Sequence, residues 1–369
     1  MQFIKCTREA LLKPLQTVGG IVEGRQTLPI LANILISKNG DKVDFTTTDL
    51  EIQIKTSATI GIGADEFKTT LPAAKTIALL TALPGSGTEV SLETDEKKIL
   101  LRANASRFSL AQLAPEDYPE LPGSEMTTSL ELPASTLKHL LQMVHFAMAQ
   151  QDIRYYLNGL LLVADNGLIR SVATDGHRLA CCDAATDVTV DSKVEAILPR
   201  KTVQQLIKLL PDTDDIVKIE LGLSQARFTF GEIEFLTKLI DGKFPDYNRV
   251  IPTHNDKMFL VNREELIGAL KRAAILANEK FKGLRWLVGP GNLHIQSANS
   301  EMEEAVEEIN INYTGEALDL GFNVTYLLDV LSNLKNSEVR FAFSTAEGAT
   351  LLTMPDSDQF RYVLMPMRI

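Results

Sequence analysis

Residues 152–179 read DIRYYLNGLLLVADNGLIRSVATDGHRL. An arginine and two tyrosines lead into an apolar run, an Asn-Gly pair and a second apolar run, a pattern that predicts two strands joined by a tight turn. The stretch ends on Thr174-Asp175-Gly176-His177-Arg178-Leu179. Weaker copies of its surroundings occur on both sides, so we interpret it as the middle unit of a repeat.

Composition describes a folded, acidic chain. Its 369 residues suit two or three domains, and 45% hydrophobic with 23% charged residues is typical of globular proteins. There is no run of eighteen apolar residues and no signal-peptide pattern at the start, so we expect a cytoplasmic protein without a membrane span. The three cysteines, with Cys181 and Cys182 adjacent, form neither a disulfide framework nor a metal-binding pair, and we expect no metal or cofactor. The net charge of −11 argues against nucleic-acid binding by the whole surface but allows a local basic surface.

Three segments share one helical pattern, repeated about every 126 residues. Apolar residues at i, i+4 and i+7 lie on a single stripe of a helix. The three trios are Leu11, Leu15 and Val18; Leu137, Leu141 and Val144; and Leu266, Leu270 and Ala273. Asn262, followed by Glu265, also predicts a capped start for the third helix.

A second helix repeats with the same period. Its apolar residues are Leu79, Leu80 and Leu83; Leu206, Ile207 and Leu210; and Val330, Leu331 and Leu334. Pro72 and Pro199 are predicted to lie just inside the first two helix starts, where a missing N–H costs nothing. Pro84 and Pro211 then end those helices. The third copy has no proline at its start.

Alternating apolar residues predict strands between the helices. Segments 42–54, 167–180 and 293–309 occupy equivalent places, and 89–103, 216–230 and 337–354 have the pattern of hairpins. The fold class is therefore α+β, with three repeated domains of two helices packed on antiparallel sheets. We predict domains at 1–125, 126–252 and 253–369, separated by turn-rich linkers at 119–128 and 251–257.

Two charge patterns accompany the repeat. Basic residues lie on the predicted helices or at their ends and would give an acidic protein a basic lining able to hold a phosphate backbone. They are Lys5, Lys13, Arg25, Lys75, Lys138, Lys201, Lys208, Lys271, Arg272, Lys280, Lys282 and Lys335. The first domain also carries Lys97, Lys98, Arg102 and Arg107, whereas the third carries Glu301, Glu303, Glu304, Glu307 and Glu308. Opposite edges of this kind favour head-to-tail pairing of chains, although charge runs are also common on solvated strand faces.

Specific motifs in all three repeats give the chain a close resemblance to the bacterial sliding clamp, the beta subunit of DNA polymerase III. The matching motifs are TLPIL (27–31), TDLE (48–51), SRFSL (106–110), QDIRYYLNG (151–159), ATDGHRLA (173–180), PRK (199–201), DGKFPDY (241–247), AILANEKFKG (274–283), GFNVTYLLDVL (321–331) and VLMPMRI (363–369).

The resemblance implies a homodimeric ring of six similar domains, with helices lining a hole that duplex DNA threads without sequence specificity. Such a ring is a processivity factor for DNA replication, not an enzyme, and would associate with the nucleoid during replication. Its implied partners are a clamp loader complex, the replicative DNA polymerase and other proteins that bind through short peptide motifs. The chain has no GxxxxGK[ST] motif, so ATP-driven ring opening falls to the loader.

The resemblance also implies three sets of site residues. The peptide-binding pocket, between the second and third domains, would comprise Arg154, Tyr156, Leu157, Thr174, Gly176, His177, Arg178, Leu179, Pro245, Arg249, Val250, Asn323, Tyr326, Val363, Met365, Pro366, Met367 and Arg368. The DNA-binding residues would be Arg25, Gln151, Tyr155, Tyr156 and Lys201. The dimer interface would pair Lys75, Arg107, Phe108 and Leu110 with Ile275, Leu276, Glu301, Glu303 and Glu304.

The pocket set suits a peptide groove, because its aliphatic residues and flexible methionines accept leucine or phenylalanine anchors. Arginine and histidine at the rim would satisfy backbone carbonyls. Asn248 departs from the family pattern, since many relatives carry arginine there, and this changes the charge expected at the rim.

Two other functions compete with the clamp. A hydrolase could use Asp175 and His177, but alternate residues of a strand share a face, and the pair would then have no nucleophile in an elbow. The chain also contains no HExxH or GxSxG motif. A protein scaffold that assembles head to tail without DNA is the third possibility.

Overall fold

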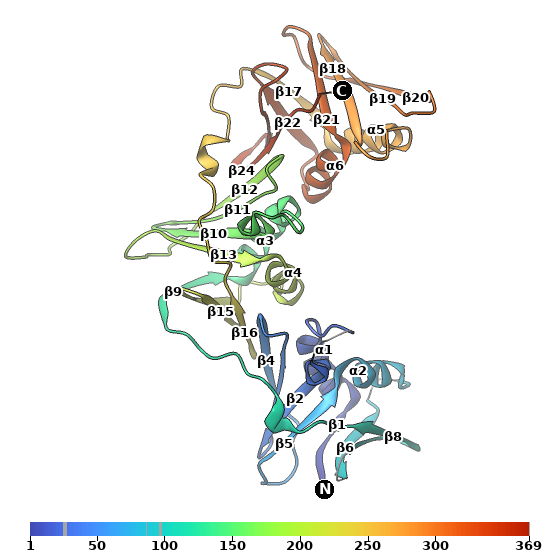
Figure 1. Ribbon diagram of the computed structural model, residues 1–369, viewed down its shortest axis with the longest axis vertical. Helices are drawn as coiled ribbons and strands as arrows, with labels where there is room; N and C mark the ends of the chain where they lie inside the picture. The colour runs from blue at the N-terminus through green and yellow to red at the C-terminus, as the bar shows by residue number, and fades with distance from the viewer. Residues whose placement is uncertain (25–27, 86, 96–97, 369) are drawn as a thin grey trace. The chain divides into compact units, whose positions relative to one another are not determined.

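The computed structural model describes residues 1–24, 28–85, 87–95 and 98–368 (Figure 1). The chain divides into two compact units. Unit 1 comprises Met1–Ser135 and Lys208–Leu239, and unit 2 comprises Thr136–Ile207 and Ile240–Ile369. The strands pair antiparallel within sheets, and helices pack on them, which confirms the predicted α+β class.

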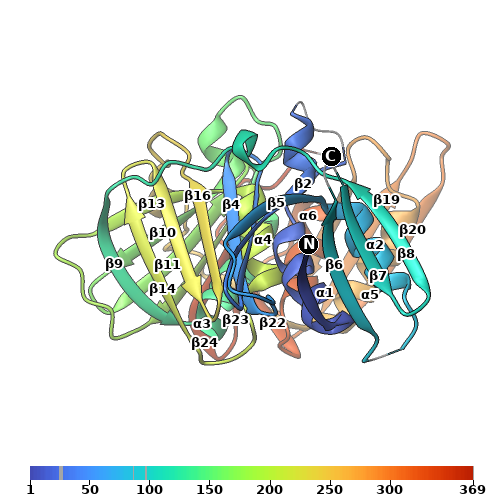
Figure 2. The same ribbon diagram turned by 90° about the horizontal axis from the view of Figure 1, so that it is seen from below.

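Unit 1 holds helices α1 (Arg8–Gly19) and α2 (Ala73–Ala82). Its four-stranded sheet has the order β1 (Gln2–Thr7), β6 (Glu89–Asp95), β7 (Lys98–Ala103) and β8 (Ser106–Ala111). Its eight-stranded sheet has the order β5 (Phe67–Pro72), β2 (Asn33–Asn39), β3 (Lys42–Thr48), β4 (Ile52–Thr59), β16 (Ile233–Lys238), β15 (Gln225–Phe230), β14 (Ile216–Gly222) and β9 (Met126–Pro133). Figure 2 shows β4 beside β16, the pairing that joins the two halves of this sheet.

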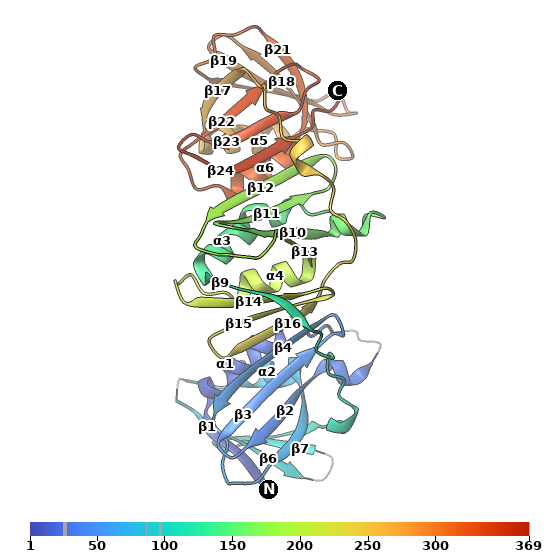
Figure 3. The same ribbon diagram turned by 90° about the vertical axis from the view of Figure 1, so that its left-hand side faces the viewer.

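Unit 2 holds helices α5 (Arg263–Ile275) and α6 (Val324–Asn333), while α3 (Ala134–Val144) and α4 (Arg200–Leu209) cross the division between the units. Its eight-stranded sheet has the order β13 (Val194–Pro199), β10 (Gly159–Asp165), β11 (Leu168–Thr174), β12 (Arg178–Ala185), β24 (Ser357–Leu364), β23 (Thr350–Met354), β22 (Glu338–Phe343) and β17 (Lys257–Asn262) (Figure 3). Its four-stranded sheet has the order β20 (Glu304–Asn310), β19 (Asn292–Ala298), β18 (Gly283–Gly289) and β21 (Leu318–Asn323).

The first helix of each repeat packs as its sequence predicts. The three apolar trios lie on α1, α3 and α5, and all nine side chains are fully buried. Burying one such aliphatic side chain stabilises a fold by about 1.5–3 kcal/mol. The side chain of Asn262 caps α5 by accepting the N–H of Glu265, as predicted, and Thr7 caps α1 in the same way. The helical period therefore identified the core correctly.

The prolines of the second helices lie one position earlier than predicted. Pro72 is the residue that precedes the first turn of α2, and Pro199 is the last residue of β13, just before α4. Each proline also ends a strand, where its missing N–H removes no helical hydrogen bond. The expectation that they lie inside the helices is wrong by one residue.

One hydrogen-bonded turn recurs in the repeats. The Thr48 hydroxyl donates to the carbonyl of Ile52, and the Asp49 carboxylate accepts the N–H of Glu51 and of Ile52. The same three bonds occur at the second repeat: the Thr174 hydroxyl donates to the carbonyl of Arg178, and the Asp175 carboxylate accepts the N–H of His177 and of Arg178. In the third repeat Asn299 accepts the N–H of Glu301 and of Glu303. In each matching Thr-Asp pair the threonine is therefore the last residue of a strand, and the aspartate lies in the turn that follows.

The basic residues divide between helices and other positions. Lys5 lies on β1, Lys280 and Lys282 follow the end of α5, and Lys335 follows α6, so these four are not helical. Arg25 and Lys97 lie outside the described residues. On helices are Lys13, Lys75, Lys138, Lys201, Lys208, Lys271 and Arg272.

Among helices in the described part of the chain, none is long and apolar enough to cross a membrane.

Candidate functional site

An apolar cluster lies on one face of the eight-stranded sheet of unit 2. Along β11 and β12 it uses alternate residues, because Val172 pairs with Cys181 and both point to the same face. The opposite face is turned to α3, where the hydroxyl of Ser171 donates to the carbonyl of Leu140. We call this group the pocket cluster; its buried members are Leu161, Val163, Val172, Leu179, Cys181, Ile197, Phe244, Tyr247 and Val363.

A loop segment, residues 244–251, forms one wall of the pocket cluster. Phe244 and Tyr247 are buried in it, and Ile251 packs against it. The short helix Tyr247–Arg249 turns the other side chains outward, so Pro245, Arg249 and Val250 are exposed. Arg249 forms an ion pair of 2.9 Å with Asp246. The amide of Asn248 lies 3.5 Å from the same carboxyl group, at an exposed position.

The turn between β11 and β12 forms a rim held by Arg154. The guanidinium of Arg154 binds the Asp152 carboxylate at 2.9 Å and the carbonyl of Asp175 at 3.3 Å. Hydrogen bonds from Arg154 lower the pKa of Asp152 to about 2. Gly176 has a φ of +91°, and a Cβ there would lie 3.0 Å from the Arg154 guanidinium. The positive φ therefore favours glycine at position 176, and any larger residue would also have to displace the end of the Arg154 side chain.

Arg178 is buried beneath this rim and ties four segments together. It donates to Asp175 at 3.1 Å, to Asp329 of α6 at 2.6 Å and to the carbonyl of Phe146 at 2.7 Å. Its guanidinium also lies 4.3 Å from the centre of the Tyr326 ring. His177, by contrast, is exposed. Its ring stacks on the ring of Tyr326, with 6.5 Å between the two centroids.

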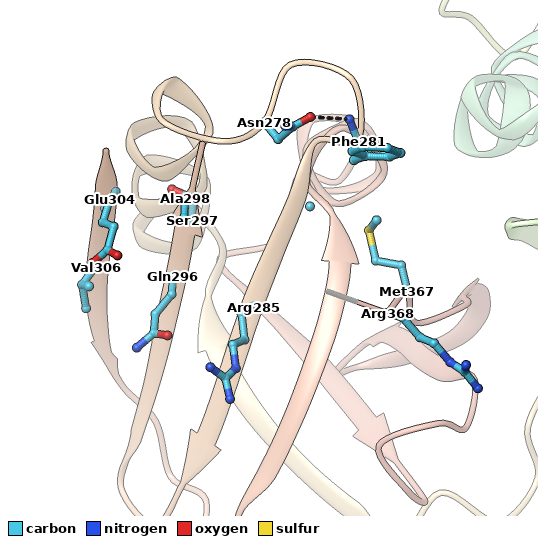
Figure 4. Close-up of a pocket in the computed structure, with 12 residues that line it drawn as sticks. Asn278, Phe281, Arg285, Gln296, Ser297, Ala298, Glu304, Val306, Met367 and Arg368 are labelled. Atoms are coloured by element: carbon cyan, nitrogen blue, oxygen red, sulfur yellow. Dashed lines mark hydrogen bonds between the residues drawn. The ribbon is translucent and has the colours of Figure 1, made fainter. Parts of the chain in front are cut away.

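The chain's last residues are attached at two points. The N–H of Met365 donates to the carbonyl of His177 at 3.0 Å, and the N–H of Met367 donates to the carbonyl of Gly321 at 2.8 Å. Met367 and Arg368 line a hollow of about 620 Å³, together with Phe281 of the loop after α5 (Figure 4). Val363 belongs to the pocket cluster, so the segment 363–368 runs from this buried cluster to the hollow lined by Met367 and Arg368.

The predicted pocket residues thus fall into several groups. Leu179 and Val363 lie in the pocket cluster and Tyr156 packs against it, while Leu157 is buried nearby in the chain. Thr174, Gly176 and Asn323 are turn and cap residues, since Asn323 caps α6 through the N–H of Thr325. Sequence reasoning missed Val172, Cys181, Phe244 and Tyr247. The alternation with Leu179 could have identified the first two.

The residues proposed for hydrolysis are not arranged for it. Asp175 and His177 lie in the turn between β11 and β12, so the expectation that they share a strand face is wrong. The Asp175 carboxylate accepts the N–H groups of His177 and Arg178 and the Arg178 guanidinium, and orients no histidine ring. Burial raises the pKa of Cys181 to about 11 and of Cys182 to about 12, which keeps both thiols protonated. Within the described ranges, histidines, cysteines and carboxylates form no group suited to a metal ion.

Family comparisons agree along the whole chain. Models of the DNA polymerase III beta subunit match in order: the N-terminal domain over residues 1–122, the central domain over 131–246 and the C-terminal domain over 248–368. The chain belongs to the DNA polymerase III beta subunit family.

Individual beta subunits are similar over their full length. The beta sliding clamp of Pseudomonas putida is 44% identical over 365 residues, and that of Escherichia coli K12 is 39% identical over 362 residues; each alignment covers 98% of both chains. A crystal structure of a sliding clamp from Pseudomonas aeruginosa bound to griselimycin has a TM-score of 0.95 and 42% identity, with 100% of both chains covered. This level of likeness confirms the resemblance seen in the sequence motifs.

The residues expected to contact DNA in a beta subunit are partly grouped. Gln151 and Tyr155 are exposed on the loop before β10, and Gln151 has a positive φ of 55°. The rings of Tyr155 and Tyr156 meet edge to face at 5.8 Å, so one tyrosine packs toward the pocket cluster and the other faces solvent. Lys201 lies in the first turn of α4. Arg25 is outside the described residues.

The residues expected at the beta-subunit dimer interface lie on two different edges. In unit 1, β8 is the terminal strand of its sheet and carries Arg107, Phe108 and Leu110, while Lys75 is exposed on α2. In unit 2, β20 is the terminal strand of its sheet; Glu304 is its first residue, and Glu301 and Glu303 lie in the segment just before it. Ile275 at the end of α5 is 77% exposed and is followed by the half-buried Leu276. Each edge combines open backbone with apolar and charged side chains.

Proposed function

We propose that this chain works as a DNA sliding clamp, a non-catalytic processivity subunit of a DNA polymerase. The observation that carries the proposal is the family match, in which three beta-subunit domains follow one another along the whole chain. Curated relatives at 44% and 39% identity are beta sliding clamps. Two chains form a ring around duplex DNA, which a clamp loader opens and closes, and the ring tethers the replicative polymerase. The site of action proposed is the cytoplasm, at the nucleoid during replication.

Each chain contributes three clamp domains, at 1–125, 126–252 and 253–369. Three pairs of helices with the same buried stripe support this division, as does the turn that recurs at Asp49, Asp175 and Asn299. The compact units do not contradict it, because sheets continue from one repeat into the next, as in the pairing of β4 with β16 and of β12 with β24.

Sliding requires contacts that hold DNA without reading its sequence. Lysines and arginines on the helices provide such contacts with phosphates, and base-edge contacts would fix the ring at one position. Arg25, Gln151, Tyr155, Tyr156 and Lys201 are the proposed DNA contacts. The exposed Tyr155 offers a surface on which a base of a single strand can stack.

Partner proteins bind the pocket cluster and its rim through short peptides. The buried residues Leu179 and Val363 would form the apolar floor, and Tyr247 part of a wall, for an aliphatic or aromatic side chain of the peptide. Met365 at the open edge adds a flexible thioether that is 43% exposed. Of the eighteen pocket residues inferred from the family motifs, Leu179 and Val363 belong to the pocket cluster and Tyr156 packs against it, which supports this proposal.

Ring closure pairs the β8 edge of one chain with the β20 edge of another. Arg107 on β8 faces a complementary set of carboxylates at Glu301, Glu303 and Glu304. Phe108 and Leu110 would contact Ile275 and Leu276, which gives the interface an apolar centre with a charged rim. Extension of a sheet across the interface would also satisfy the open backbone groups of both strands.

A topological experiment tests the function. The chain is loaded on nicked circular DNA with a clamp loader and ATP, washed at high salt, and the DNA is then cut once. We expect retention on the circle and release after the cut, because screened phosphate contacts cannot depend on distant ends. Binding that is lost in high salt and indifferent to the cut would exclude an encircling ring.

A further inference from the structure

Three ionic side chains lie on the same sheet face as the pocket cluster. Asp183 of β12 accepts hydrogen bonds from Arg170 of β11, at 2.6 Å from Nε and 2.7 Å from Nη2. Nη2 of Arg361, on β24, donates to the same carboxylate at 2.6 Å. The side chains are 17–26% exposed, so the group is largely but not completely covered. We call these three residues the ionic cluster.

The ionic cluster continues directly from the apolar floor. Arg361 is paired across the sheet with Cys181, and its Nη2 atom lies 3.5 Å from the Cys181 sulfur. Arg170 donates to the hydroxyl of Tyr247 at 3.3 Å, and its guanidinium lies 5.7 Å from the centre of that ring. Cys181 and Tyr247 both belong to the pocket cluster. A peptide seated on the apolar floor therefore has the ionic cluster as its next neighbour.

The charges of the ionic cluster do not cancel. Two guanidinium groups share one carboxylate, which leaves one positive charge in a partly covered site. Arg361 has unused donors: its Nε atom is buried without a hydrogen-bond partner, and no bond from Nη1 occurs within the described residues. A cation with unsatisfied donors in such a place favours an added anionic acceptor.

We propose that the ionic cluster is a carboxylate subsite of the peptide groove, with Arg361 as its binding group and Asp183 and Arg170 as positioning residues. The inference rests on the proposed peptide pocket and adds a specificity to it. A partner segment that places an apolar side chain on the pocket cluster presents a carboxylate to Arg361. The carboxylate belongs to an aspartate or glutamate beside the apolar anchor, or is the C-terminal carboxylate of the segment.

The test uses the full-length chain and synthetic peptides with a Leu-Phe anchor. One peptide is neutral with an amidated C-terminus, two carry an aspartate on either side of the anchor with the C-terminus amidated, and one is neutral with a free C-terminus. Dissociation constants are measured by fluorescence anisotropy for wild type and Arg361→Gln. The control is Arg227→Gln, which removes another strand arginine of similar exposure (28%) whose buried Nε also has no hydrogen-bond partner.

We expect at least one carboxylate-bearing peptide to bind wild type about three- to tenfold more tightly than the neutral amide, a range reduced by the partial exposure of the site. The peptide that gains affinity shows whether a side chain or a terminus supplies the carboxylate. Arg361→Gln should abolish the gain, Arg361→Lys should restore part of it, and Arg227→Gln should retain it.

Two results would overturn the subsite separately from the pocket. Equal binding of acidic and neutral peptides by wild type would show that the ionic cluster contributes no specificity. A preference for acidic peptides that survives Arg361→Gln would assign that preference to another residue. If no peptide binds a folded wild-type chain, the peptide pocket itself is wrong and the subsite with it.

Discussion

Nη1 of Arg178, the first residue of β12, lies 2.6 Å from Oδ2 of Asp329 on α6, and the two residues are 151 positions apart. This bond joins the rim of the pocket cluster to a helix of the following repeat. Arg178 is only 8% exposed, so its charge depends on Asp329 and Asp175 for compensation.

Asp329→Ala should therefore loosen α6. Removal of the Asp329 carboxylate should lower the free energy of opening α6 by about 1–2 kcal/mol. The loss is smaller than for a fully buried pair, because Asp329 is 35% exposed. Amide hydrogen exchange in α6 should then be about five- to thirtyfold faster. Asp358→Ala, at an exposed position on β24, serves as the control and should leave exchange in α6 unchanged.

Asp152 should remain ionised well into the acid range. Hydrogen bonds from Arg154 lower its pKa in the folded chain to about 2, below the value near 4 of an unfolded chain. The contact between Arg154 and ionised Asp152 therefore stabilises the folded chain above pH 4, and this stabilisation is lost as the pH falls toward 2. Carboxyl carbon chemical shifts should show a midpoint near 2 in wild type, and a midpoint near 4 would contradict the Arg154 contact.

Deletion of residues 365–369 should abolish peptide binding without unfolding the chain. The described part of this segment is attached by two backbone hydrogen bonds, from Met365 and Met367, whereas the preceding Val363 and Leu364 are buried in β24. Circular dichroism should be unchanged, and the anchor peptides should lose measurable affinity. Unchanged affinity would show that the open edge contributes nothing to the pocket.

Leu141→Ala should destabilise the central repeat. The side chain is fully buried on the apolar stripe of α3, and truncation to alanine in such a position costs about 2–5 kcal/mol. Denaturant unfolding should reach its midpoint at a lower concentration. Ile153→Ala, where the wild-type side chain is 96% exposed, should shift the midpoint little.

Ile275→Asp should weaken the dimer. This exposed isoleucine is proposed to occupy the apolar centre of the ring interface, where loss of a central contact and burial of a charge cost at least about 1.4 kcal/mol, or tenfold in affinity. Sedimentation velocity over a dilution series would measure the change. Leu223→Asp, at a leucine that is 96% exposed, is the control; an equal effect of both substitutions would remove Ile275 from the interface.

Much of the fold follows from periodicity in the sequence. The apolar stripes of α1, α3 and α5 were predictable because residues spaced by the 3.6-residue helical period share one buried face. The hairpins were predictable because alternate residues of a strand share one face. The turn at Asp175 was mistaken for strand, because it occupies only residues 175–177 between two strands of alternating apolar residues.

The candidate site was less predictable, because its contacts are non-local. The buried role of Arg178 depends on Asp329 and Phe146, neither of which is near it in sequence. The ionic cluster likewise needs β24 beside β12, a pairing between residues about 180 positions apart. Family motifs indicated the region of the pocket, but only the sheet register shows that Asp183 and Arg361 meet beside it.

Two backbone hydrogen bonds, from Met365 and Met367, hold the segment 365–367 in place without using its side chains. Because the N–H groups carry the attachment, the Met365 side chain can change rotamer without releasing the backbone. If Met365 forms the edge of the proposed peptide pocket, that edge can adapt to peptide side chains of different width through side-chain torsions alone. Tolerance for many partners would then be a local property of one thioether, independent of any rearrangement of the sheet beneath it.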